Sequence, residues 1–108
     1  MGFLDLFKHI DINTEIENMK AVDNAVLLDV RSEEEYKDGH IPNSINVPVE
    51  KIENVNSLIP NLETPVYVYC LRGTRSASAV KAMEKMGYKN AKSIGGIASY
   101  KGTVETVG

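Results

Sequence analysis

The chain has 108 residues and a formal net charge of -3 at pH 7, with 43% hydrophobic and 25% charged residues. This length predicts one domain, residues 1–108, that can bury a core without covalent cross-links. The negative charge argues against nucleic acid or an anionic membrane as a partner, and the single cysteine excludes an internal disulfide and a multi-cysteine metal site.

Residues 1–9 are predicted to form an N-terminal apolar helix or extension. Four apolar side chains of residues 1–10 fall on one helical face: Phe3, Leu4, Phe7 and Ile10. We expect this face to pack on the domain or on a second subunit, which makes a monomer or weak homodimer the predicted state. The stretch does not fit a signal peptide, and no apolar run is long enough to span a bilayer. We therefore expect no membrane contact and a cytoplasmic location.

Short strands and helices are predicted to alternate from the start of the chain. Ile10–Ile12 fits a short edge strand, and Thr14 with Glu17 forms a capping-box pattern that opens a helix toward Val22. The run AVLLDV, Ala25–Val30, is continuously apolar and of strand length. Such a run is typical of a strand that is buried on both faces of a sheet.

The next segment repeats this alternation. Ser32 and Glu35 form a second capping box, and Gly39 is predicted to end that helix in a left-handed conformation. Two prolines bracket NSINV, Asn43–Val47, which fits another short strand. A helix is then predicted over Val49–Leu58, before the next proline.

The second half carries the strongest pattern. PVYVYC, Pro65–Cys70, is β-branched and aromatic, which predicts a strand. From Thr74 to Met86 the apolar spacing becomes helical, and Gly87 is expected to end that helix. AKSI, Ala91–Ile94, fits a final short strand, and a last helical turn follows two glycines.

Strands that alternate with helices predict the α/β class, with a central, mainly parallel sheet and helices on both faces. Ligands of such sheets bind at the carboxyl ends of the strands. Cys70 and Asp29 both fall at such ends.

The loop VYVYCLRGTRSASAV joins the strongest strand to its helix and holds the only cysteine, Cys70. The N–H groups and the helix N-terminus in such a loop favour an anion. Gly73 permits the tight turn, and Arg72 and Arg75 supply guanidinium groups for an oxyanion. A positive environment lowers the pKa of a thiol, and the thiolate is a nucleophile. The alternative for Cys70 alone is an ordinary buried apolar residue.

LLDVRSEEEYKDGHIPNSINVP followed by VYVYCLRGTRSASAVKAMEKMGYKNAKSIGGIASYKG resembles the rhodanese family of sulfurtransferases, in its single-domain form. The resemblance covers nearly the whole chain after about residue 10. It implies that Cys70 takes a sulfane sulfur and holds it as a persulfide, without metal or organic cofactor. The implied anion-binding loop consists of Leu71, Arg72, Gly73, Thr74 and Arg75.

The resemblance also implies the partners of the reaction. The donor would be a small anion such as thiosulfate, drawn in by Arg72. Because Cys70 has no second thiol in the chain to resolve its persulfide, the acceptor is expected to be external: cyanide, a small thiol or a protein. The alternatives are a non-catalytic rhodanese-like binding module and a redox sensor that acts through Cys70.

The length of the loop separates this interpretation from a phosphatase. Four residues lie between Cys70 and Arg75. Phosphatases with a related loop have one residue more, which leaves room for a tetrahedral phosphate. The shorter loop is the one associated with sulfur transfer.

Four further residues are candidates for supporting roles. Asp29 is expected either to accept hydrogen bonds that hold the loop or, as a structural residue, to pair with Arg31 or cap its segment. Arg31 is also expected to pair with Glu35, four residues along the chain. His40 is predicted to be structural rather than a general base, because a thiolate in an anion pocket needs none.

Overall fold

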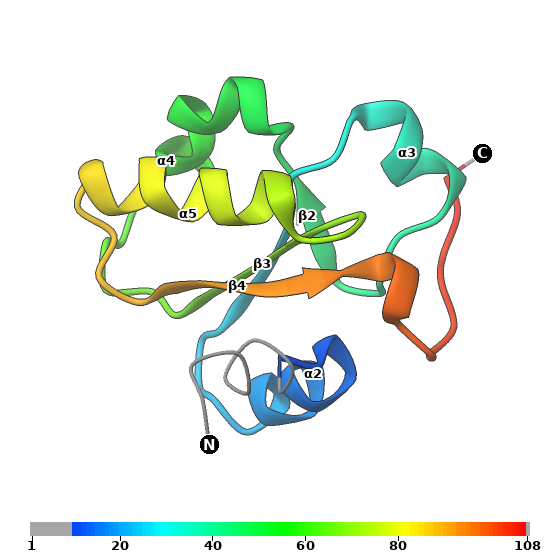
Figure 1. Ribbon diagram of the computed structural model, residues 1–108. Coiled ribbons are helices and arrows are strands. Elements are labelled where there is room, and N and C mark those ends of the chain that lie inside the picture. Colours follow the sequence, from blue (N-terminus) through cyan, green and yellow to red (C-terminus); the bar gives the residue numbers. More distant parts are fainter. Residues whose placement is uncertain (1–9, 108) are drawn as a thin grey trace, which may run out of the picture.

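The computed structural model describes residues 10–107, and this part of the chain contains a four-stranded parallel sheet (Figure 1). The strand order is β2-β1-β3-β4. The strands are β1 Val26–Asp29, β2 Ser44–Asn46, β3 Val66–Cys70 and β4 Ala91–Gly96. The helices are α2 Ile12–Lys20, α3 Glu33–Asp38, η1 Val49–Asn54, α4 Val55–Leu58, α5 Thr74–Lys85 and η2 Ile97–Ser99, where η marks a 3-10 helix. The predicted α/β class and parallel sheet are confirmed.

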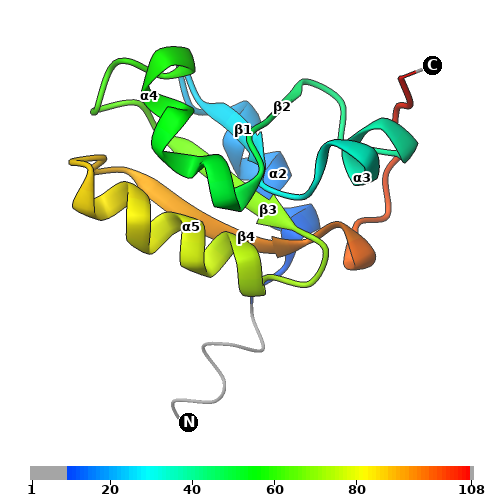
Figure 2. The same ribbon diagram turned by 90° about the horizontal axis from the view of Figure 1, so that it is seen from above.

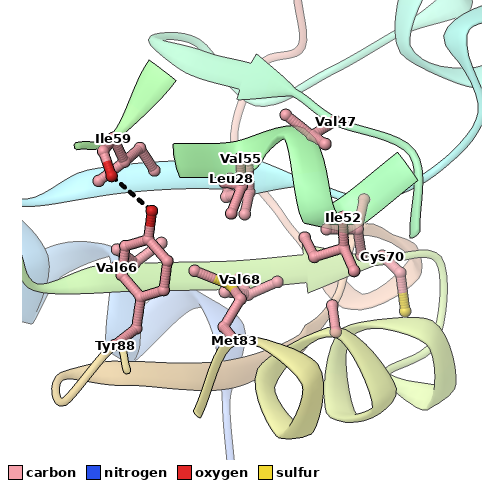
Figure 3. Close-up of a cluster of buried hydrophobic side chains, with 12 residues drawn as sticks. Leu28, Val47, Ile52, Val55, Ile59, Val66, Val68, Cys70, Met83 and Tyr88 are labelled. Atoms are coloured by element: carbon pink, nitrogen blue, oxygen red, sulfur yellow. Dashed lines mark hydrogen bonds between the residues drawn. The ribbon is translucent and has the colours of Figure 1, made fainter. Parts of the chain in front are cut away.

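The two faces of the sheet bury two separate apolar clusters. In Figures 1 and 2, α4 and α5 lie on one side of the sheet and α2 lies on the other. The first cluster joins Leu28 and Val68 to Met83 of α5 (Figure 3). The second joins Ile16 of α2 to Tyr69 of β3. Because side chains alternate along a strand, the fully buried β3 serves both clusters.

The start of the described chain differs from the prediction. Ile12 is the first residue of α2, so the predicted edge strand is wrong. The N-cap is Asp11, whose carboxylate accepts a hydrogen bond from the amide of Asn13 at 3.0 Å. Thr14 donates to the same carboxylate, so the predicted capping box with Glu17 is also wrong. The predicted N-terminal helix over residues 1–9 lies outside the described residues.

Three other local predictions are corrected by the backbone. Gly39 ends α3 with φ 168°, which is extended rather than left-handed. The single helix predicted over Val49–Leu58 is instead a 3-10 segment over its first six residues, kinked at the non-helical Lys51, followed by the short α-helix α4. β4 continues past the predicted AKSI to Gly96. The capping box of Ser32 is present as predicted.

The pairing of β3 with β4 contains an irregularity that matters for the site. Val68 lies opposite Ser93, whereas Cys70, two residues on, lies opposite Gly96, three residues on. The extra residue on β4 is a bulge, which bends the strand at the carboxyl end of the sheet. Within residues 10–107, no helix has the length and apolar character needed to cross a membrane.

Candidate active site

Cys70 is the last residue of β3 and is 1% exposed. Its sulfur lies at the margin of the first apolar cluster and points toward α5 (Figure 3). The Sγ atom accepts hydrogen bonds from the amides of Gly73, at 3.0 Å, and Ser76, at 3.3 Å. The hydroxyl of Ser76 lies 3.6 Å from Sγ. Cys70 is therefore a core residue, as the alternative interpretation held, and its sulfur also accepts hydrogen bonds from the loop that follows it.

The surroundings of Cys70 lower the pKa of its thiol. Burial is the largest single influence, and it opposes the charged thiolate. The hydroxyl and amide of Ser76 and the amides of Gly73 and Arg72 favour the thiolate, and together they outweigh burial. The loop therefore prepares a nucleophile in a site that is nearly closed to water.

The loop is shaped by glycine at two points. Gly73 caps α5 with φ +111°, a conformation that L side chains rarely adopt. Gly96 of β4 lies directly against the loop, because a Cβ there would overlap the carbonyl oxygen of Leu71. That oxygen accepts a hydrogen bond from the amide of Ala98 at 3.1 Å. The loop thus rests on the end of β4.

The mouth of the site is a cavity of about 170 Å³ lined by Cys70, Leu71, Arg72, Thr74 and Arg75. The predicted loop residues are thus brought together, with Gly73 acting through its amide. Arg72 is exposed and also lines a larger cavity of about 760 Å³ beside the loop, formed with α2, β4 and η2. The small cavity holds the sulfur, so it is the candidate site despite its size.

Arg75 is held by the carboxylate of Glu35, which belongs to α3 and lies 40 residues earlier in the sequence. Its Nη1 and Nη2 donate to the two carboxylate oxygens of Glu35 at 2.7 and 3.1 Å. This contact with Arg75 lowers the pKa of Glu35 to about 2, against the opposing effect of burial. The Oε1 atom of Glu35 also accepts the amide of Ser32 in the capping box. One carboxylate therefore joins the start of α3 to the candidate site.

Asp29 and Arg31 form an ion pair of their own. Nη2 of Arg31 lies 2.6 Å from Oδ2 of Asp29, and both side chains are buried. The same Nη2 donates to the carbonyl of Gly39 at 2.7 Å. The predicted pair of Arg31 with Glu35 is wrong, because Arg31 turns back to β1. The Asp29 carboxylate accepts hydrogen bonds from the amide and the guanidinium of Arg31, which agrees with the structural alternative for this residue.

His40 lies in the turn after α3 and is 6% exposed. Its ring stacks on Tyr36 with centroids 3.8 Å apart, and Nδ1 lies 2.8 Å from the carbonyl oxygen of Tyr36. Its backbone pairs with Glu105 in an isolated antiparallel bridge. These contacts agree with a structural role in fixing the turn.

Two serines of the site were missed by the sequence analysis. Ser76 is fully buried, and its hydroxyl lies 2.7 Å from that of Ser93 on β4. A serine in the first turn of a helix that follows a cysteine loop was a usable signal for Ser76. The sequence carries no comparable signal for Ser93, which reaches the site through the pairing of β3 with β4.

The donors gathered at this loop suit an anion rather than a metal ion. Among residues 10–107, no group of three or more His, Cys, Asp or Glu side chains could hold a metal. Around Cys70 the inward groups are amides and a hydroxyl, with two arginines at the mouth. Such an arrangement stabilises negative charge on sulfur and on a bound oxyanion.

Comparison with known proteins places these features among related chains. The family model described as the rhodanese-like domain matches residues 13–103. The adenylyltransferase and sulfurtransferase uba4 of Ogataea parapolymorpha is 34% identical over 96 residues, which are 88% of this chain and 25% of that protein. The thiosulfate sulfurtransferase PspE of Escherichia coli is 32% identical over 71 residues, which are 65% of this chain and 68% of that protein.

A solved structure shares the architecture. The human single-domain sulfurtransferase TSTD1 superposes with a TM-score of 0.71 at 29% identity, over 81% of this chain and 89% of that one. The chain therefore spans a quarter of the length of uba4, 68% of the length of PspE and 89% of the TSTD1 chain.

Proposed function

The chain belongs to the rhodanese-like domain family, and from that membership we propose that it is a sulfurtransferase that carries a sulfane sulfur on Cys70. One observation carries the proposal: the buried Sγ of Cys70 accepts the amides of Gly73 and Ser76 at the base of a cavity flanked by two arginines. This environment stabilises a thiolate and admits a small anion. Relatives named sulfurtransferases support the same activity.

The first half of the reaction would load the sulfur. The Cys70 thiolate attacks the outer sulfur of thiosulfate, a new S–S bond forms, and the original S–S bond breaks with its electron pair on the leaving sulfite. Arg72 and Arg75 line the mouth and attract the anionic donor. The loop amides then hold the inner sulfur of the persulfide in the place where they held the thiolate.

The second half would unload it. A cyanide ion or a thiolate attacks the outer sulfur, and the S–S bond breaks with its electron pair on Cys70. Cys70 returns to the thiolate, which the same amides stabilise as a leaving group. Because the chain has one cysteine, no second thiol of its own can take part, and the acceptor is external. A small thiol or a protein in the cytoplasm is the acceptor that we propose.

Glu35 gives Arg75 a defined place in this scheme. Two parallel hydrogen bonds fix the guanidinium plane, which leaves less freedom to lose when an anion binds. Arg72 is exposed and reaches the same mouth from the solvent side. We therefore assign orientation of the donor to Arg75 and its attraction to Arg72.

The test is the intact mass of the protein after incubation with thiosulfate, compared between the wild type and Cys70→Ser. The expected result is a gain of one sulfur atom in the wild type alone, reversed by cyanide. A gain in Cys70→Ser, or none in folded wild type with any sulfane donor, contradicts the proposal. A stable sulfenate after mild peroxide without sulfur loading favours the redox-sensing module instead.

A further inference from the structure

A pair of serine hydroxyls lies behind the Cys70 sulfur. The Oγ atom of Ser76 is 3.6 Å from Sγ, 3.1 Å from the carbonyl oxygen of Gly73 and 2.7 Å from the Oγ of Ser93. Ser76 belongs to the first turns of α5, and Ser93 belongs to β4, opposite Val68 of β3. Two elements therefore meet through one short hydroxyl contact beside the reactive atom.

The hydrogen bonds of Ser76 change when Cys70 ionises. A serine hydroxyl donates one proton and accepts two hydrogen bonds. In the thiol state, Sγ donates to Ser76, and Ser76 donates to the carbonyl of Gly73. In the thiolate state Sγ only accepts, so the Ser76 proton turns to the charged sulfur, which makes the stronger bond. The Ser76 oxygen then no longer receives a hydrogen bond from sulfur.

Ser93 can supply the hydrogen bond that Ser76 loses. Within the described chain, Ser93 is the other hydroxyl in contact with the Ser76 oxygen, and Ser76 is fully buried. A hydrogen bond from Ser93 also polarises the Ser76 hydroxyl and strengthens its bond to the thiolate. Without Ser93, the buried Ser76 oxygen would accept no such bond in the thiolate state. The contact thus stabilises the charged form more than the neutral one.

We propose that Ser93 is a positioning residue that acts on Cys70 through Ser76, by donating to Ser76 and so directing the Ser76 proton to the thiolate. The inference rests on the proposed function, because the thiolate is the form that attacks the donor and leaves the persulfide. The other charged groups around the thiol are Arg72 on the loop, Arg75 with its partner Glu35, and the ion pair at the end of β1. Substitution of Ser93 changes none of these charges.

The test measures the titration of Cys70 directly. Because the chain has one cysteine, the rate of alkylation by iodoacetamide, followed by intact mass across a pH series, reports on Cys70 alone. For Ser93→Ala we expect the midpoint of the rise in alkylation rate with pH, which reports the pKa of Cys70, to lie at a higher pH. Below the wild-type midpoint, alkylation of this variant should be about three- to tenfold slower. Ser93→Thr keeps the hydroxyl and should stay close to the wild type.

Two further variants separate this role from packing. Ser93→Val has the shape of Ser93→Thr without the hydroxyl, so this pair decides the question even if the alanine variant fails to fold. Ser99→Ala is the matched control, since Ser99 lines the same large cavity beside the loop but is exposed. The proposal is overturned if the valine and threonine variants titrate alike, or if Ser99→Ala shifts the midpoint as much as Ser93→Ala.

This experiment remains informative if the proposed function fails. Alkylation needs no sulfur donor, so the midpoint can move in Ser93→Ala even in a protein that thiosulfate does not load. That outcome would reject sulfur transfer from thiosulfate but support the role of Ser93 in stabilising the Cys70 thiolate through Ser76. If thiosulfate loads the wild type with sulfur but Ser93→Ala leaves the titration midpoint of Cys70 unchanged, sulfur transfer is supported and the role of Ser93 is rejected.

Discussion

Cys70 belongs to the apolar core and to the candidate site at the same time. Cys70 is a buried member of the first apolar cluster, and its sulfur accepts hydrogen bonds from two loop amides. Burial alone would keep the thiol protonated. The amides reverse that preference at close range, so the reactivity of Cys70 depends on loop positions accurate to a few tenths of an ångström.

The close approach of Gly96 to the backbone of Leu71 helps to fix the position of the Cys70 loop. Gly96→Ala should therefore both destabilise the protein and disturb the site. A Cβ there overlaps the Leu71 carbonyl, and the neighbours are backbone that must move. We expect a loss of about 1–3 kcal/mol in the free energy of unfolding, measured by urea denaturation, together with slower sulfur loading. Gly39→Ala is the control, because its nearest neighbour is a side-chain atom of Val104 at 3.4 Å. Equal stability of the two variants would contradict this account.

Arg75 should not tolerate replacement by lysine. An ammonium group cannot make the two parallel bonds that the guanidinium makes with Glu35. We expect Arg75→Lys to lower kcat/KM for thiosulfate by about tenfold or more, with a loss in the free energy of unfolding no larger than that of Glu35→Gln. Lys81→Ala, an exposed cation on the same helix, should leave the kinetics unchanged. A wild-type kcat/KM in Arg75→Lys would remove Arg75 from the site.

At the scale of the elements, α3 is connected to α5 by the Glu35 carboxylate. Glu35 caps its own helix through Ser32 and holds Arg75 at the start of α5. The helix itself has six residues and buries none of them, so it gains little from packing. Its position beside the site therefore depends on polar contacts, with the buried pair of Arg31 and Asp29 directly before it.

The connection between α3 and α5 should weaken in acid. The pKa of Glu35 is about 2 in the folded state, below its usual value of 4.5, because Arg75 stabilises the carboxylate. The stabilisation is therefore complete above about pH 4.5 and is lost as the pH falls toward 2. Glu35→Gln should reduce the free energy of unfolding at neutral pH and flatten its dependence on pH across this window.

Urea denaturation at a series of pH values measures this effect. Glu34→Gln is the control, because Glu34 is an exposed acid of the same helical turn. A pH dependence of Glu35→Gln identical to that of the wild type and of Glu34→Gln would show that the connection contributes nothing. Since Glu35 is partly exposed, added salt should also shrink the difference between the wild type and Glu35→Gln.

The elements that the sequence predicted well are those coded by local patterns. β3 is apolar and β-branched, and the capping box of Ser32 with Glu35 spans four residues, so both follow from neighbouring chemistry. The start of α2 was missed because Thr14 with Glu17 fits a cap as well as Asp11 does. The contacts of Ser76 with Ser93 and of Arg75 with Glu35 span 17 and 40 residues. No local pattern encodes such distances.

At the scale of the whole molecule, Tyr69 connects the centre of the sheet to the turn after α3. Its hydroxyl accepts the amide of Ile41 at 3.0 Å and lies 3.1 Å from the hydroxyl of Ser44. Burial raises the pKa of Tyr69, so this hydroxyl stays protonated. Through Tyr69, the turn that carries His40 is attached to the strand that carries Cys70.

Tyr69→Phe should therefore destabilise the fold as a whole. It leaves the buried amide of Ile41 without its partner, which costs about 1–3 kcal/mol. The shift of the urea midpoint measures this loss. Tyr67→Phe is the matched control on the same face of β3, because the Tyr67 hydroxyl makes no hydrogen bond within residues 10–107. Equal midpoints of the two variants would contradict the role of the Tyr69 hydroxyl.

The bulge between β3 and β4 makes the length of β4 as important as its residues. Ser93 and Gly96 lie on either side of the irregular pairing, one behind the sulfur and the other beneath the loop. Removal of one residue between them would restore a regular ladder and move one of these two residues out of place. Removal of Gly95, which is outside both apolar clusters, would leave the core residues in the chain and change the environment of the Cys70 thiol. A one-residue deletion at the bulge would therefore change the chemistry of Cys70 without replacing Cys70 itself.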